Sequence, residues 1–187
     1  MPKITVHIAE GGTELNLDDG SSKAGHMWIT TENGESYGFA PLQSEQFGPG
    51  KIYTNDESNY KSTLYEKTIE VTDSQYKDMI KFMKDPANNG FSLDYNAYSH
   101  SCVDFVWKAL EKGGINTKNF EGDVVPSNNV DDLKKLPSKT PEVDNKTSEN
   151  SSKGPPIHRV SFNENSLNTQ KDDPSIDNED LNINTMA

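Results

Sequence analysis

Apolar and polar residues alternate in several stretches of the first half of the chain. In residues 3–9, KITVHIA, every second residue is apolar, and we expect His7, on the opposite face, to be solvated. Residues 24–41, AGHMWITTENGESYGFAP, form two extended runs around an Asn-Gly pair, which is typical of a β-hairpin turn. Residues 62–71 alternate in the same way. These patterns predict a small antiparallel sheet.

Helical spacing follows the strand patterns. Thr72 and Gln75 have the spacing of a capping box and precede an apolar stripe. Residues 99–114, SHSCVDFVWKALEKGG, begin with serines that can cap a helix and continue with apolar residues at helical spacing. Residues 130–136 can form a last short helix. Residues 42–61, rich in Gly, Pro, Asn and Ser, are expected to form a long connecting loop, and such loops are often functional.

The composition of the chain changes at residue 137. Residues 137–187 are dominated by Ser, Thr, Asn, Asp, Glu, Lys and Pro, and such a segment buries too little apolar surface to offset the entropy of ordering it. We therefore expect one folded domain over residues 1–136 and a disordered, acidic and polar tail over residues 137–187. The predicted sheet and helices place the domain in the α+β class.

The charge and the motifs exclude several functions. A net charge of −12 would repel nucleic acid and anionic lipid, so neither is an expected partner. There is no apolar run long enough to span a bilayer and no signal-peptide pattern at the start. Because the sequence has no CxxC pair, no HExxH motif and no glycine-rich phosphate loop, we expect no metal and no cofactor.

The candidate chemistry depends on the single cysteine, Cys102, and on two histidines. Cys102 lies in the first turn of the helix predicted over residues 99–114, where free N–H groups and the helix dipole favour a thiolate. His26 opens the first strand of the predicted hairpin, and His100 lies two residues before the cysteine. A thiol at a helix start facing a histidine from a strand is the core of cysteine-nucleophile catalysis. The alternative is that Cys102 is an unreactive core residue.

Two segments, GHMWITTENGESYGF and YSHSCVDFVWKALEKGGI, resemble in this order the circularly permuted branch of the papain-like fold. That branch includes NlpC-type cell-wall peptidases, the YiiX-like group and lecithin:retinol acyltransferase-like proteins. The pattern SC-x-D-F-x-x-x-A-L-x-x-x-G-I is especially similar to bacterial amidase domains attached to type VI secretion and related toxin systems. The resemblance covers about residues 24–115 and implies a small antiparallel sheet packed on helices.

The resemblance also implies roles for individual residues. Cys102 would be the nucleophile and His26 the general base. The third, orienting residue of NlpC-type enzymes would fall at Gly38, which has no side chain, whereas hairpin register would put Tyr37 or Glu35 on the histidine face. The site is therefore expected to be a dyad or to take its third group from elsewhere in the chain.

His100 occupies the position at which relatives often have asparagine. It could hydrogen-bond the oxyanion or hold the thiolate, or it could be a loop histidine with no role. The backbone N–H of Cys102 is a further candidate donor to the oxyanion.

The function implied by the resemblance is hydrolysis of amide bonds in peptidoglycan peptides by an antibacterial effector. Such a protein would be made in the cytoplasm, carried by a secretion machine into the periplasm of a target cell, and paired with an immunity protein. Two alternatives stay open. The same two residues could serve acyl transfer or ester and thioester cleavage on a lipid or protein, or the domain could be a non-catalytic binding module.

Overall fold

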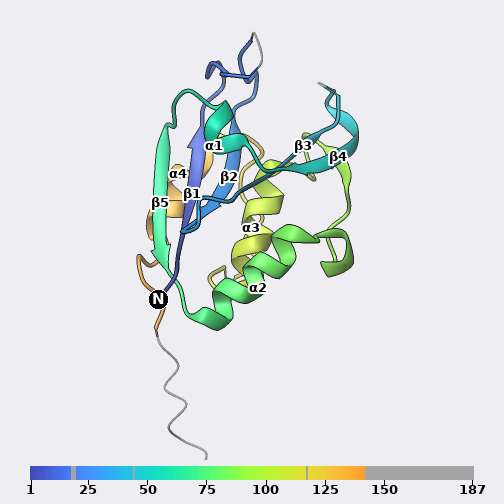
Figure 1. Cartoon of the computed structure of the whole chain (residues 1–187). Coiled ribbons are helices and arrows are strands. Elements are labelled where there is room, and N and C mark those ends of the chain that lie inside the picture. Colours follow the sequence, from blue (N-terminus) through green and yellow to red (C-terminus); the bar gives the residue numbers. More distant parts are fainter. Residues whose placement is uncertain (18–19, 44, 117, 142–187) are drawn as a thin grey trace, which may run out of the picture. The chain divides into compact units, whose positions relative to one another are not determined.

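A six-stranded antiparallel sheet packed on helices forms the centre of the molecule (Figure 1), as the computed structural model describes it for residues 1–17, 20–43, 45–116 and 118–141. The strand order is β5-β1-β2-β3-β4-β6, and the α+β class predicted from the sequence is confirmed. The predicted disordered tail lies, from residue 142 onward, outside the described residues. The strands are β1 (Lys3–Ala9), β2 (His26–Thr31), β3 (Ser36–Pro41), β4 (Phe47–Tyr53), β5 (Tyr65–Glu70) and β6 (Asp94–Asn96). The helices are α1 (Asp56–Asn59), α2 (Asp73–Lys84), α3 (Cys102–Lys112) and α4 (Val130–Lys135), with short 3-10 turns η1 (Ala87–Asn89) and η2 (Pro126–Asn129).

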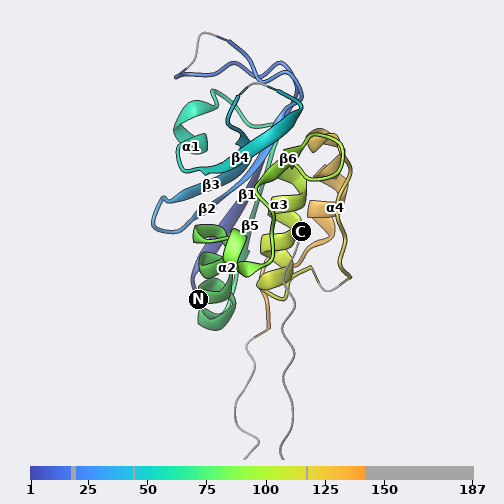
Figure 2. The ribbon, with the colours of Figure 1, turned by 90° about the vertical axis from the view of Figure 1, so that its right-hand side faces the viewer.

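The two faces of the sheet are covered differently. The apolar residues of β1 (Ile4, Val6 and Ile8) are fully buried in a core that also contains the apolar faces of α2 and α3. Burying such a side chain contributes about 1.5–3 kcal/mol, so this inner face holds the domain together. Figure 2 shows α1 on the opposite, outer face of the sheet. None of the helices in the described part of the chain is long and apolar enough to cross a membrane.

The hairpin predicted around Asn33-Gly34 forms as β2 and β3. The Gly34 N–H donates to the carbonyl of Thr31, and Gly34 has a φ of +80°, which favours glycine. The two strands pair at only two positions, Ile29 with Tyr37 and Thr30 with Ser36. Beyond this pairing the strands diverge, as Figure 1 shows, and α3 packs against both of them.

Both long helices begin where the sequence predicted. Thr72 caps α2 in a capping box with Gln75, as their spacing indicated. Ser101 caps α3: its hydroxyl accepts from the N–H of Val103, and the Asp104 carboxylate accepts from the N–H of Ser101. This cap fixes Cys102 as the first residue of the helix.

The expected long loop over residues 42–61 is wrong in detail, because it contains β4 and α1. Gly48, Pro49 and Gly50 make the β4 segment a poor strand by local preference. Pairing with β3 on one side and with β6 on the other overrides that preference.

The domain continues past the predicted boundary at residue 136. Ser138 and Thr140 pair in parallel with β5: the Glu70 N–H donates to the Ser138 carbonyl, and the Thr140 N–H donates to the Glu70 carbonyl. Thr140 is 3% exposed, and its hydroxyl lies 2.6 Å from Gln75 Oε1. Within the described residues, the folded domain therefore extends past residue 136 to at least Thr140.

Two truncations test this contribution of the C-terminal segment to stability. A chain ending at Leu136 loses the hydrogen bonds of Ser138 and Thr140, each of which contributes about 0.5–1.5 kcal/mol. We expect its thermal midpoint to fall by several degrees. A chain ending at Asp144 keeps these bonds and should match the full chain in calorimetry. Equal midpoints for the two truncations would contradict the assignment.

Candidate active site

Cys102 and His26 meet where β2 and β3 diverge. Cys102 opens α3 and is 5% exposed, and His26 opens β2 and is 4% exposed. The Cys102 side chain is near enough to the imidazole to contribute to raising the pKa of His26. The structure thus brings together the two residues that the sequence singled out.

A third residue, Asp56, joins them from α1. Its carboxylate is buried, and Oδ1 lies 3.4 Å from Nε2 of His26. The other oxygen, Oδ2, has no hydrogen-bond partner within the described residues. The sequence analysis did not identify Asp56. The feature that pointed to this region was the length of the segment 42–61, which was expected to be a long and functional loop.

Gly38 makes room for this carboxylate. A Cβ atom at Gly38 would overlap Oδ2 of Asp56 and lie only 2.6 Å from Nε2 of His26. Gly38 is the position at which the resemblance places an orienting side chain. Here the Asp56 carboxylate, from α1, occupies the volume that a side chain at position 38 would need. The glycine is therefore required for the carboxylate to lie against the strand.

The charge of His26 follows from this environment. Burial by itself would lower the pKa of His26, but the Asp56 carboxylate, Tyr60 and the hydrogen bond with Cys102 outweigh it and raise the pKa well above its usual value. The Tyr60 ring stacks on the imidazole with centroids 5.2 Å apart. A buried imidazolium and carboxylate of this kind each depend on the other for compensation.

A further phenol borders the thiol. Tyr95, on β6, is partly buried, and its pKa is raised by burial and by the neighbouring Cys102 and Tyr60. The hydroxyl of Tyr95 therefore keeps its proton and can donate a hydrogen bond.

Two other residues that the sequence analysis considered for the site, His100 and Tyr37, make contacts away from His26. The His100 ring stacks on Phe91 at 4.1 Å, and its Nε2 lies 2.8 Å from the Ser92 carbonyl. Tyr37 pairs with Ile29 in the core, on the face of the sheet opposite to His26. An orienting role for Tyr37 is therefore wrong, because the observed hairpin register turns it inward. The carboxylate of Glu35 bonds Lys84 at 3.0 Å.

The expectation that His7 is solvated is also wrong. His7 is 4% exposed, because the outer face of the sheet is covered. Its ring stacks on Trp28 with centroids 5.0 Å apart, and Nε2 lies 2.7 Å from the Thr30 hydroxyl. Glu57 and Glu66 each place a carboxylate oxygen within 3.5 Å of the ring nitrogens.

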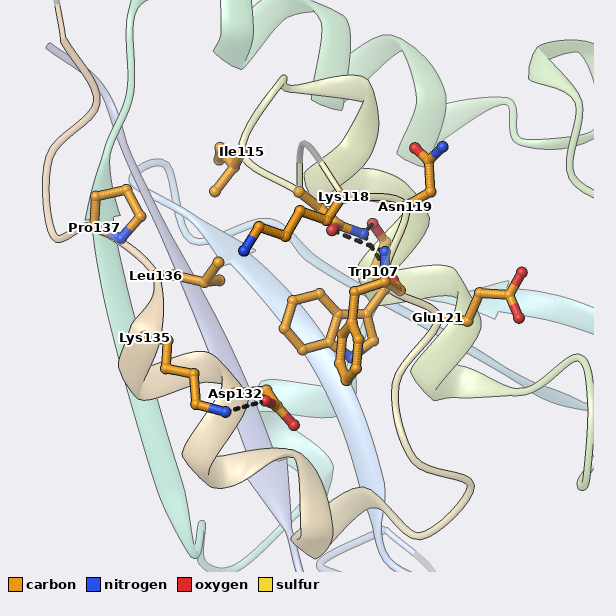
Figure 3. Close-up of a pocket in the computed structure, with 11 residues that line it drawn as sticks. Trp107, Ile115, Lys118, Asn119, Glu121, Asp132, Lys135, Leu136 and Pro137 are labelled. Carbon is orange, nitrogen blue, oxygen red and sulfur yellow. Dashed lines mark hydrogen bonds and ion pairs between the residues drawn. The ribbon is translucent and has the colours of Figure 1, made fainter.

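Two surface pockets are lined by other residues of the domain. One, of about 640 Å³, is bordered by Trp107 of α3, by residues 115–116 and 118–121, and by α4. Figure 3 shows Trp107 in its wall, the Lys118 side chain extending across it and the ion pair of Asp132 with Lys135 at its side. A second pocket, of about 430 Å³, shares Trp107 with the first. Cys102, His26 and Asp56 line neither pocket.

Comparison with known proteins found no family model, no curated protein and no solved structure that matches this chain. The fold and the site therefore define a class only in chemical terms. The chain is an α+β protein that brings a thiol, an imidazole and a carboxylate together from three separate elements. Within the described residues, no group of three His, Cys, Asp or Glu side chains is arranged to hold a metal ion.

Replacing Gly38 with alanine tests the packing of the carboxylate over the strand. The new methyl group would displace Asp56 from His26, so we expect the His26 pKa, measured by NMR titration, to fall toward its usual value. Gly20→Ala is the control, because a Cβ atom there meets nothing within 4 Å. An unchanged His26 pKa in Gly38→Ala would show that Asp56 is not held over this glycine.

The raised pKa of His26 also predicts how stability depends on pH. The folded chain binds the imidazole proton more tightly than the unfolded chain, whose histidine pKa is about 6.5. This contribution to the free energy of unfolding is therefore complete below about pH 6.5 and is lost as the pH rises through the folded-state pKa.

Urea unfolding from about pH 6 to about pH 9 should show this loss in the wild type but not in His26→Gln. Parallel pH dependences in the two proteins would contradict a raised pKa.

Proposed function

We propose that this chain is a cysteine-dependent amide hydrolase in which Cys102 is the nucleophile and His26 the general base. The observation that carries the proposal is the buried imidazole of His26, which lies 3.4 Å from the Asp56 carboxylate and whose pKa is raised by that carboxylate and by Cys102. Three groups of this kind, delivered by three elements, are what nucleophilic catalysis by a thiol requires.

The first chemical step forms an acyl-enzyme. With Nε2 facing Asp56, Nδ1 of His26 is the nitrogen that takes the thiol proton. Because the pKa of His26 is raised, this transfer comes before the substrate binds and leaves a Cys102 thiolate beside an imidazolium. The Cys102 sulfur attacks the amide carbonyl carbon, and the carbonyl becomes an oxyanion. The first-turn N–H of Cys102 and the protonated hydroxyl of Tyr95 supply hydrogen bonds to that oxyanion. His26 then gives its proton to the leaving amine as the C–N bond breaks.

The second step releases the product. His26 takes a proton from water, the hydroxide attacks the thioester, and the carboxylic acid leaves as the thiol is regenerated. Asp56 stabilises the imidazolium in both steps and fixes the orientation of the ring, as the carboxylate does in a Ser-His-Asp triad. The raised pKa of His26 means that the ring holds the proton it takes until the leaving group needs it.

The substrate that we propose is a peptide amide bond of peptidoglycan. This part of the proposal rests on the resemblance of residues 24–115 to amidase domains of secreted antibacterial effectors. The protein would act in the periplasm of a target cell after delivery by a secretion machine, and an immunity protein would protect the producing cell.

Digestion of purified sacculi tests the reaction. We expect the wild-type protein to release muropeptides that mass spectrometry identifies, and Cys102→Ala to release none. Asp56→Asn keeps the size of the side chain but loses its charge, so its rate should fall by about 10²-fold or more. His100→Ala is the matched control and should keep most of the activity, because that ring is bound to Ser92.

Alkylation by iodoacetamide at neutral pH separates the alternatives. If the rate of alkylation of Cys102 is about tenfold lower in His26→Ala than in the wild type, the two residues act as a catalytic pair. If that thiol is reactive but sacculi stay intact, the result favours acyl transfer or ester cleavage by the same residues. An inert thiol that His26→Ala does not change would overturn the enzyme proposal, since Cys102 would then be a core residue.

A further inference from the structure

The helix that carries Asp56 is too short to be stable by itself. α1 has four residues, and its N-cap, Asn55, makes no side-chain capping bond. The Asp56 carboxylate is nevertheless buried, at 3.4 Å from the imidazole of His26. Contacts with the rest of the chain must therefore hold α1 in place. Asn16 and Leu17 bond Ser58 and Asn59 at its C-terminal end, and side chains of the sheet contact its N-terminal end, next to Asp56.

Trp28 of β2 makes the contact that lies next to Asp56 in the sequence. It is 1% exposed and lies two residues after His26 on the same face of the strand. Its indole Nε1–H donates to Oε2 of Glu57, the residue next to Asp56, at 3.1 Å. The Glu57 N–H in turn lies 3.4 Å from the hydroxyl of Ser36 on β3. Side chains of β2 and β3 thus both contact Glu57, the residue that follows Asp56.

Aromatic stacking adds to this anchor. Tyr60, directly after α1, stacks on Trp28 at 4.9 Å and on His26 at 5.2 Å. The opposite neighbour of Trp28 is His7, whose ring is nearly parallel to the indole at 5.0 Å. The indole therefore packs between the ring of His7 and that of Tyr60, the C-cap of α1.

From these contacts we propose that the Trp28–Glu57 hydrogen bond positions Asp56 against His26, so that Trp28 and Glu57 are positioning residues of the site. Neither side chain needs to touch a substrate. The consequence for catalysis rests on the proposed function, whereas the consequence for His26 does not.

A direct effect of the Glu57 charge is the competing explanation. The groups that face His26 are Asp56 and Tyr60, from α1 and its C-cap, and Cys102, from α3. The Glu57 carboxylate instead faces His7, at 3.5 Å, and its side chain is 53% exposed. Solvent therefore screens any action of its charge at a distance.

The experiment measures the His26 pKa by NMR titration in the full chain. Trp28→Phe removes the N–H donor without changing charge, and Glu57→Ala removes the acceptor at an exposed site. We expect both changes to lower the His26 pKa by about one unit, toward its value in Asp56→Asn. Glu57→Gln keeps an acceptor oxygen and should restore most of the wild-type value. Glu66→Ala removes the other carboxylate beside His7 and is the control.

Two results would overturn the proposal. If Glu57→Gln lowers the pKa as much as Glu57→Ala while Trp28→Phe leaves it unchanged, the carboxylate acts through its charge. If Glu57→Ala has no effect, α1 is held by other contacts, and this surface variant decides the case even if Trp28→Phe does not fold. If the pKa of His26 shifts as expected but the wild-type protein leaves sacculi intact, the proposed hydrolase activity is wrong. The positioning of Asp56 by Trp28 and Glu57 is then still supported.

Discussion

The ion pair of His26 with Asp56 is the interaction on which the candidate site depends. Two groups that carry opposite charge are taken almost completely out of water, and such burial is tolerated only when each compensates the other. The sheet satisfies this condition by leaving Gly38 without a side chain, so that the carboxylate lies in contact with the strand. Loss of any one of the three would leave an uncompensated charge or an overlap.

The limited pairing of β2 and β3 is compatible with the position of this pair. If the two strands paired along their whole length, the start of β2 would be occupied by a neighbouring backbone. Because their pairing is limited to two positions, the beginning of α3 can bring the thiol to the imidazole from the inner side, while α1 brings the carboxylate from the outer side. The site thus joins the two faces of one sheet.

Local rules account for most of the elements that the sequence predicted. The alternation in β1, the Asn-Gly turn and the two capping boxes each depend on residues close together in the chain. For the same reason the position of Cys102 at a helix start could be read from the sequence. The chemistry of the side chains left two histidines as its possible partner, and the resemblance implied His26.

Long-range contacts account for what the sequence did not predict. β4 forms because β3 pairs with a segment that contains Gly48, Pro49 and Gly50. α1 is stabilised by contacts such as the hydrogen bond of Trp28 with Glu57. Asp56 could not be distinguished from the many other carboxylates of an acidic chain until the fold placed it beside an imidazole. His7 is buried for a similar reason, since α1 and its neighbours cover a strand face that alternation alone marks as polar.

The pairing of residues 138–140 with β5 has a consequence for self-association. An outer strand with free N–H and C=O groups is a template onto which another polypeptide can add and start aggregation. Here the chain itself occupies part of that rim, with the Glu70 N–H and C=O both engaged. The charged side chains of Lys3 and Lys139 flank Glu70 at the same place. The segment therefore covers part of the β5 edge and disfavours the addition of a strand from another molecule there.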